Sequence, residues 1–154
     1  MQVFSIHADQ IAETAVLPTA LPDQGFVWLS FSRREFEIMQ GQVQQMLHRL
    51  CDVQIYELHL QDVLNNQLPS HYDYTGDYDV LVFRRLAQGR SETDLSKPGE
   101  ILHRANAHSG PSILRKIDTS PVAFVVFDRV VISVHPVDCA VLKAFVGKLM
   151  SSSH

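Results

Sequence analysis

The chain has 154 residues, of which 45% are hydrophobic and 19% charged, and this composition is typical of one globular domain rather than a disordered chain. The formal net charge is −4 and the sequence has no basic run, so it does not predict a surface that binds nucleic acid. The two cysteines lack the spacing of a disulfide or metal framework. The longest apolar run, residues 122–127, is much shorter than the about 20 residues of a membrane helix, and the N-terminus lacks the pattern of a secretory signal.

The N-terminal third predicts two strands and a long helix. Residues 2–7 and the FVWLSF segment at 26–31 are short β-type runs, separated by a link that contains Pro, Asp and Gly. Ser32 is followed three residues later by Glu35, which is the pattern of a capping box, so we expect a helix to begin there. The apolar residues of this helix recur at spacings of three and four and form one stripe: Phe36, Met39, Val43, Leu47 and Leu50.

The middle of the chain predicts a short strand, a short helix and then more β-structure. We expect a strand at 53–56 and a helix at 57–66, which ends ahead of a proline. From Ser70 onwards the pattern predicts either two strands or one strand that bends about Gly76. The apolar residues at 80–83 follow one another without alternation, which predicts that both faces of the sheet are covered there.

The C-terminal part predicts a hairpin over residues 121–136 and a last helix that Asp138 caps and that runs to Met150. The segment 87–119 is rich in polar residues, and we expect it to be mobile or to be ordered by a neighbour. Together the elements predict a mixed α/β fold of the α/β/α sandwich type. Its sheet is expected to be largely antiparallel, with six or seven strands and helices on both sides.

No complete catalytic or metal-binding motif is present in the sequence. The eight histidines show no HExxH pattern and no Cys partner at zinc-ligand spacing, and the glycine-rich phosphate loops are absent. His59 and Asp62 are three residues apart on the predicted short helix, so they can begin a metal site without completing one; an exposed polar face is the alternative. We expect that the chain is not an enzyme, and a small hydrolase that uses a histidine and an aspartate stays the minor alternative.

The segment 58–86 resembles the cytoplasmic domain of CorA-type magnesium transporters. In that family a short helix with a D-[VI]-L-N-like ending precedes a proline, an acidic-aromatic strand and an apolar strand, and the same order is found here. The segments FVWLSFSRREFEIMQ and VVFDRVVISVHP and a helix start at 141–150 resemble further family segments in the right order. The resemblance covers roughly residues 26–86 and 120–150, whereas the family's Gly-Met-Asn signature and membrane helices are absent from this sequence.

The resemblance implies an arrangement of domains and a function. Residues 1–137 would form the funnel-type cytoplasmic domain, and residues 138–154 would begin the stalk helix that leads to a membrane region outside this sequence. Transporters of this family are homopentamers of the inner or plasma membrane, and they bind regulatory divalent ions between the cytoplasmic domains of their subunits. Loss of the ion would shift the population toward conducting arrangements.

The same resemblance implies a metal site on the predicted short helix. Asp62 matches the regulatory carboxylate of the family, and Gln61 stands where a glutamate is frequent. The implied ion is Mg²⁺, and His59 beside these residues would admit Co²⁺, Ni²⁺ or Zn²⁺. The implied partner is a second copy of the chain rather than nucleic acid, and the membrane is reached only through the missing C-terminal helices. The alternative is a free-standing α/β domain that binds a ligand or a protein without a membrane partner.

Overall fold

The structure, a computed structural model, describes residues 1–8, 10–86, 119–137 and 139–152. The strands are β1 (Gln2–His7), β2 (Gln10–Thr14), β3 (Phe26–Ser32), β4 (His71–Tyr74), β5 (Asp79–Leu86), β6 (Thr119–Val126) and β7 (Val130–His135). The helices in the described ranges are α1 (Arg33–Cys51), α2 (Glu57–Leu64) and α6 (Ala140–Ser152). Backbone contacts divide the chain into two units, Met1–Phe83 with Pro121–His154 and Arg84–Ser120, and the layers described below belong to the first unit.

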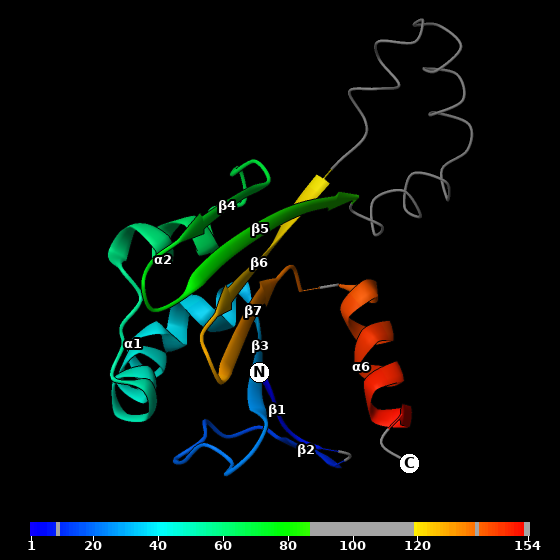
Figure 1. Cartoon of the computed structure of the whole chain (residues 1–154). Coiled ribbons are helices and arrows are strands. Elements are labelled where there is room, and N and C mark those ends of the chain that lie inside the picture. The colour runs from blue at the N-terminus through cyan, green and yellow to red at the C-terminus, as the bar shows by residue number, and fades with distance from the viewer. Residues whose placement is uncertain (9, 87–118, 138, 153–154) are drawn as a thin grey trace, which may run out of the picture. The chain divides into compact units, whose positions relative to one another are not determined.

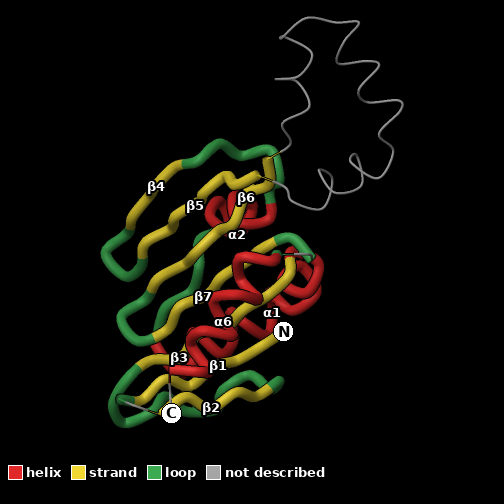
Figure 2. The backbone as a smooth tube through the Cα atoms, turned by 90° about the vertical axis from the view of Figure 1, so that its right-hand side faces the viewer, coloured by secondary structure: helices red, strands yellow, loops and turns green. Residues whose placement is uncertain are grey.

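The strands form one sheet of seven, in the order β2-β1-β3-β7-β6-β5-β4, which can be followed from bottom to top in Figure 2. Strand β3 pairs in parallel with β7, with Leu29 opposite Ile132. The pairs β1–β2, β1–β3, β4–β5 and β6–β7 are antiparallel. The predicted mixed α/β fold with a largely antiparallel sheet of six or seven strands is therefore confirmed, and its centre is formed by strands from the two ends of the chain.

Helix α1 covers one face of the sheet and begins where the sequence predicts. The Ser32 hydroxyl accepts the Glu35 backbone N–H at 3.2 Å, and the Glu35 carboxylate accepts the Ser32 N–H at 2.9 Å, so the capping box is complete. The helix ends at Asp52, whose φ of 54° is left-handed. The predicted stripe docks on the sheet: Phe36, Val43 and Leu47 are buried together with Met46, and Met39 and Leu50 pack at the edge of this core.

Helix α6 lies on the opposite face of the sheet from α1, as Figure 1 shows. Trp28 of β3 stacks on Phe4 at 4.9 Å between ring centroids and meets Phe145 of α6 edge-on at 5.5 Å. The indole N–H of Trp28 donates to the buried Ser133 hydroxyl at 2.8 Å, so its polar atom is satisfied inside the layer. The prediction of helices on both sides of the sheet is confirmed.

Several expectations about local structure are wrong. Residues 53–56 do not form a strand, because the Gln44 side chain takes both backbone groups of Ile55, at 2.8 Å from the N–H and 2.7 Å from the carbonyl oxygen. Strand β2 was not expected, since its residues are mostly exposed and show no apolar alternation. The 80–83 run is not covered on both faces by described residues, because Phe83 is 52% exposed.

Two expectations about the fold concern residues that the structure does not describe. The cap predicted at Asp138 and the segment 87–118 lie outside the described residues. Within the described ranges, no helix combines the length and the apolar character that a membrane span requires.

Two strands, β4 and β5, form in the segment after Ser70, where the sequence predicted either two strands or one bent strand.

Candidate functional site: the contact between α2 and β4

The residues predicted for a metal site lie on α2, which packs beside β4. The buried residues of α2 are His59, Leu60 and Val63, and the two apolar ones belong to the main hydrophobic core. Residues four apart share one side of a helix, so His59 lies above Val63 on the side that faces the core. Gln61 is exposed on the other side. The helix therefore separates residues that the sequence placed in one site.

His59 is only 4% exposed, and both of its ring nitrogens have partners. Its Nδ1 lies 2.8 Å from the Tyr78 hydroxyl, and its Nε2 lies 2.9 Å from the Asp73 carboxylate. The Tyr78 hydroxyl also accepts the backbone N–H of Tyr56 at 2.9 Å. The imidazole thus connects α2 to β4 and to the start of β5, and it can reach a metal ion only by giving up one of these contacts.

The carboxylate partner of His59 fixes the role of one ring nitrogen. A carboxylate can only accept, so Nε2 carries the hydrogen that goes to Asp73. This hydrogen bond from His59, with a second one from the Tyr74 backbone N–H, holds the pKa of Asp73 below its usual value. Burial raises the pKa of Tyr78, so its hydroxyl keeps its proton at neutral pH and remains available as a hydrogen-bond donor.

Asp62 is turned toward β4 rather than toward His59. Its carboxylate lies 3.9 Å from Nε2 of His71, and the two side chains are 22% and 29% exposed. Gln61 stays at the surface, where its amide donates to Glu57 at 3.4 Å. No group of three or more metal-type side chains assembles within the described part of the chain. The metal-site hypothesis therefore depends on Asp62 and Gln61 together with further metal ligands from outside the described residues.

Sequence reasoning missed the partners of His59. Asp73 and Tyr78 were not among the predicted site residues, although both lie in the part after Ser70 that the pattern predicted as β-structure. One available signal was the position of His59 four residues before Val63, which puts it on the apolar stripe of α2. A histidine on a buried stripe needs hydrogen-bond partners from the neighbouring element, and here the next strand along the chain supplies them.

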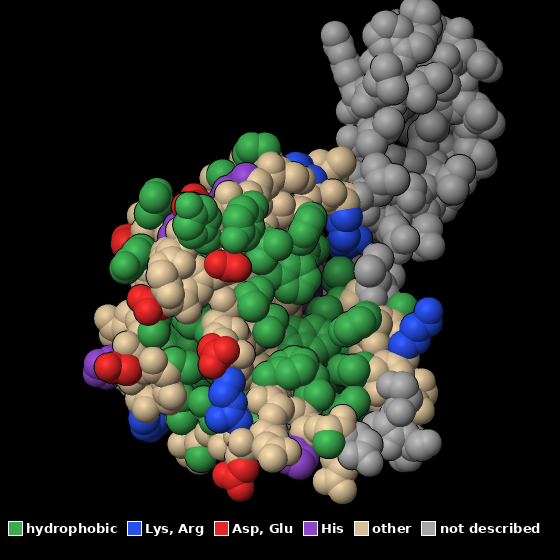
Figure 3. Space-filling model, viewed as in Figure 1, with side chains coloured by type: hydrophobic (Ala, Val, Ile, Leu, Met, Phe, Trp, Pro, Cys, Tyr) green, Lys and Arg blue, Asp and Glu red, His purple; other side chains and the backbone are tan. Residues whose placement is uncertain are grey.

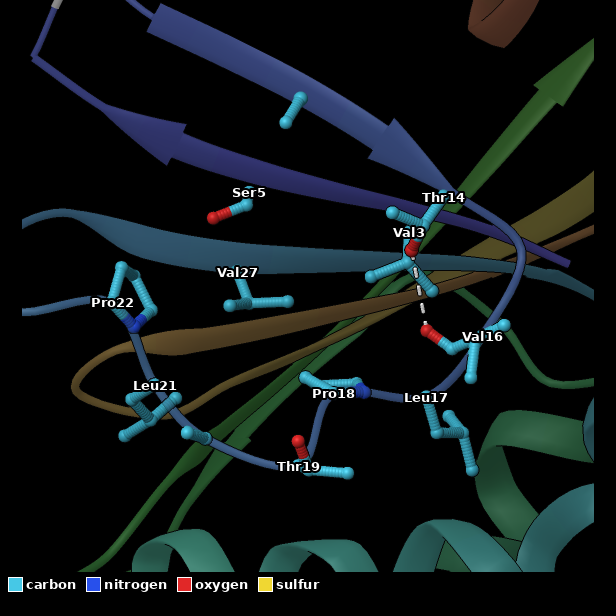
Figure 4. A pocket seen from close by; sticks show the side chains of 12 residues that line it. Val3, Ser5, Thr14, Val16, Leu17, Pro18, Thr19, Leu21, Pro22 and Val27 are labelled. Atoms are coloured by element: carbon cyan, nitrogen blue, oxygen red, sulfur yellow. Dashed lines mark hydrogen bonds between the residues drawn. The ribbon is translucent and has the colours of Figure 1, made fainter.

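A separate pocket of about 450 Å³ lies between the first three strands and the link 15–25, as Figure 4 shows. The link is held in place by Arg129, which donates to the carbonyl oxygens of Pro22 and Gly25. Gly25 has a φ of +97° and approaches β1 so closely that a Cβ would lie 2.0 Å from the Ile6 carbonyl oxygen. The lining contains no titratable group, so this pocket has no means for acid–base catalysis: Val3, Ser5, Ala12, Thr14, Val16, Leu17, Pro18, Thr19, Ala20, Leu21, Pro22 and Val27.

No protein-family model and no curated protein matches this sequence. Solved structures do match its fold. The cytoplasmic domain of ZntB from Vibrio parahaemolyticus has a TM-score of 0.62 at 12% identity, with 99% of this chain and 50% of that chain covered. The CorA magnesium transporter of Methanocaldococcus jannaschii has a TM-score of 0.55 at 10% identity, with 98% and 36% covered. Full-length CmaX has a TM-score of 0.58 at 14% identity, with 99% and 39% covered.

This chain spans half or less of the length of each of these proteins. Almost all of it superposes on them, whereas the identities are too low to show more than the fold. The resemblance predicted from the sequence is confirmed at that level: the chain has the α/β fold of the ZntB cytoplasmic domain and of the matched parts of CorA and CmaX.

Proposed function

We propose that this chain is the regulatory cytoplasmic part of a divalent-cation transporter of the CorA type, which gates in response to an ion bound between subunits. The observation that supports the proposal most strongly is the match of 99% of the chain to a structure described as the ZntB cytoplasmic domain.

The geometry of α2 favours Asp62 as the sensing residue. Its carboxylate is partly exposed. Its neighbour His71 lies 3.9 Å away, which is too far for a hydrogen bond, so the carboxylate oxygens can still bind a metal ion. Mg²⁺ binds oxygen ligands, so a carboxylate from each of two subunits would repel its partner without the ion and hold it with the ion. His59 has a positioning role in this proposal, because its nitrogens hold α2 against β4.

His71 bears on the choice of ion. An imidazole next to the Asp62 carboxylate offers a nitrogen ligand, which Mg²⁺ uses rarely and which Zn²⁺, Co²⁺ and Ni²⁺ accept readily. The pair therefore favours regulation by one of these softer ions in addition to Mg²⁺. In the protease-resistance assay described below, replacing His71 by alanine should weaken the protection of the assembly that Zn²⁺ gives. The protection that Mg²⁺ gives should stay unchanged.

The test uses the full-length protein that contains this chain. Titration with Mg²⁺ should increase the resistance of the wild-type assembly to protease, and Asp62→Ala should require a much higher ion concentration for the same effect. Asp23→Ala removes an exposed carboxylate from the β2–β3 link and serves as the matched control. Equal protection of wild type and Asp62→Ala would remove Asp62 from the sensor, and a reading frame without downstream apolar stretches would refute the transporter itself.

A free-standing ligand-binding domain is the second candidate, and the uncharged pocket under the link 15–25 favours it. A compact monomer whose size and stability do not respond to divalent ions would support this function. In that case, small neutral compounds should shift the amide resonances of Val3 and Val27, which are buried residues of the pocket wall.

A further inference from the structure

The pocket under the link 15–25 has a floor of small side chains. Ser5 of β1 lies opposite Ala12 of β2 and opposite Val27 of β3, and residues that pair directly across strands point to the same face of a sheet. Val3 shares this face, because side chains two apart on a strand point the same way. Alanine and serine fill little of the space below the link, and a pocket of about 450 Å³ results.

The link that forms the other wall of the pocket is fixed by several contacts. Leu17 and Leu21 pack against the main hydrophobic core. The Arg129 guanidinium donates to the carbonyl oxygens of Pro22 and Gly25, which ties the end of the link to the β6–β7 turn. The pocket is therefore formed before a ligand arrives, and its volume lies in the range of about 300–1,000 Å³ that small-molecule sites have.

The pocket is bounded by described residues of one backbone unit. Its 12 lining residues all lie between positions 3 and 27, within Met1–Phe83. Figure 3 shows that hydrophobic side chains also gather over the middle of the molecule. An open surface of that kind sets no limit on the size of a partner, whereas a pocket with a floor and a wall limits both the size and the chemistry of its ligand.

The lining of the pocket determines which ligands fit it. It contains no charged and no aromatic side chain, so a charged ligand would lose water without gaining a counter-charge. Its apolar part is aliphatic, with Val3 and Val27 buried at the floor. The hydroxyls of Ser5 on β1 and Thr19 on the link form no hydrogen bond within the described part of the chain. These hydroxyls can therefore pair with a polar atom of a ligand.

We propose that this pocket binds a small neutral molecule with an aliphatic body and one hydroxyl, carbonyl or amide group. The aliphatic body lies on Val3, Val27 and the leucines of the link, and the polar group bonds to the Ser5 hydroxyl. The proposal rests on the pocket of the second candidate function and adds the class of ligand. It is compatible with the transporter function as well, because the Asp62 carboxylate does not line the pocket.

The test titrates the isotope-labelled 154-residue chain with butan-1-ol, hexan-1-ol and octan-1-ol and follows the methyl resonances of Val3 and Val27 by NMR. Each added methylene group that becomes buried should lower the Kd up to about four-fold. Hexanoate and hexylammonium should both bind at least about ten-fold more weakly than hexan-1-ol. Both ions are needed, because the net charge of −4 would by itself repel hexanoate and attract hexylammonium.

A larger side chain at the floor tests whether the alcohols occupy the pocket. Ala12→Leu fills the pocket from an exposed position of the edge strand and should weaken the binding of hexan-1-ol at least about ten-fold. Ala144→Leu makes the same change at an exposed position of α6 and should leave the Kd unchanged. If Ala12→Leu fails to fold, Ala20→Leu takes its place, because Ala20 is an exposed lining residue of the link.

The polar contact has its own variant. Ser5→Ala removes one net hydrogen bond and should weaken hexan-1-ol about five-fold, while the gain for each methylene group stays the same. Equal Kd values for hexan-1-ol and the two ions, or wild-type affinity of the filled variant, would overturn the proposal. Wild-type affinity of Ser5→Ala would overturn the role of the hydroxyl. The Asp62→Ala titration measures ion binding instead, so the sensor proposal and the pocket proposal can fail separately.

Discussion

Replacing His59 by alanine tests whether this residue holds α2 against the sheet. The change removes a buried imidazole, its hydrogen bond to Tyr78 and its contact with Asp73. The Asp73 side chain is 50% exposed, so it regains water and contributes little to the loss. The remaining loss is one net hydrogen bond and a cavity of imidazole size, so we expect the free energy of unfolding to fall by about 2–3 kcal/mol.

Urea unfolding followed by circular dichroism measures this loss. His48→Ala is the matched control, because the His48 side chain is 66% exposed on α1 and its nearest carboxylate, Asp52, is 3.7 Å away. The control should change the free energy of unfolding by less than about 0.5 kcal/mol. Both measurements are made with and without Zn²⁺, since a ligand role would make the loss depend on the ion. A His59→Ala variant as stable as His48→Ala would refute the bridging role.

Three further outcomes follow from local geometry. Gly25→Ala should destabilise the chain by more than about 1 kcal/mol in thermal unfolding, because the new Cβ would meet the Ile6 carbonyl oxygen at a left-handed backbone position, whereas Gly76→Ala, with open space around its Cβ, should be nearly neutral. Gly41→Ala should stabilise the chain by about 0.5–1 kcal/mol in urea unfolding, because it lies inside α1 with nothing within 4 Å of the new methyl group; a destabilised variant would contradict this. Burial raises the pKa of Glu35, but hydrogen bonds from the N-terminal ammonium and from the helix N-terminus outweigh it and hold the pKa at about 2 instead of 4.5. Because this pKa is lowered by folding, its stabilisation is complete above pH 4.5 and is lost as the pH falls toward about 2, and Glu35→Gln should flatten that part of the pH–stability curve.

Elements that depend on local chemistry could be predicted from the sequence. The start of α1 follows from the Ser32–Glu35 pair, whose two hydrogen bonds form within four residues of chain. The strand at 26–31 follows from a run of apolar and β-type residues, because its two faces are both buried between helices. Neither inference needs knowledge of a distant contact.

Elements that depend on distant contacts could not be predicted. The segment 53–56 has the composition of a strand, but the side chain of Gln44, on the preceding helix, satisfies the backbone of Ile55. Strand β2 is polar and exposed at the sheet edge, so only its pairing with β1 defines it. His59 was correctly predicted to lie on a helix. That its side chain is buried depends on the packing of α2 on β4, which the sequence did not predict.

The position of the β6–β7 hairpin has a consequence for the synthesis of the protein. The strands made first gather into two groups, β2-β1-β3 and β5-β4, and they meet only through this hairpin, which is translated later. A nascent chain that ends before residue 119 therefore holds two incomplete parts of the sheet with unpaired backbone edges. Such edges can pair with strands of other chains and start aggregation. We expect the whole sheet to gain protection from hydrogen exchange in a single late step, after the ribosome releases the hairpin.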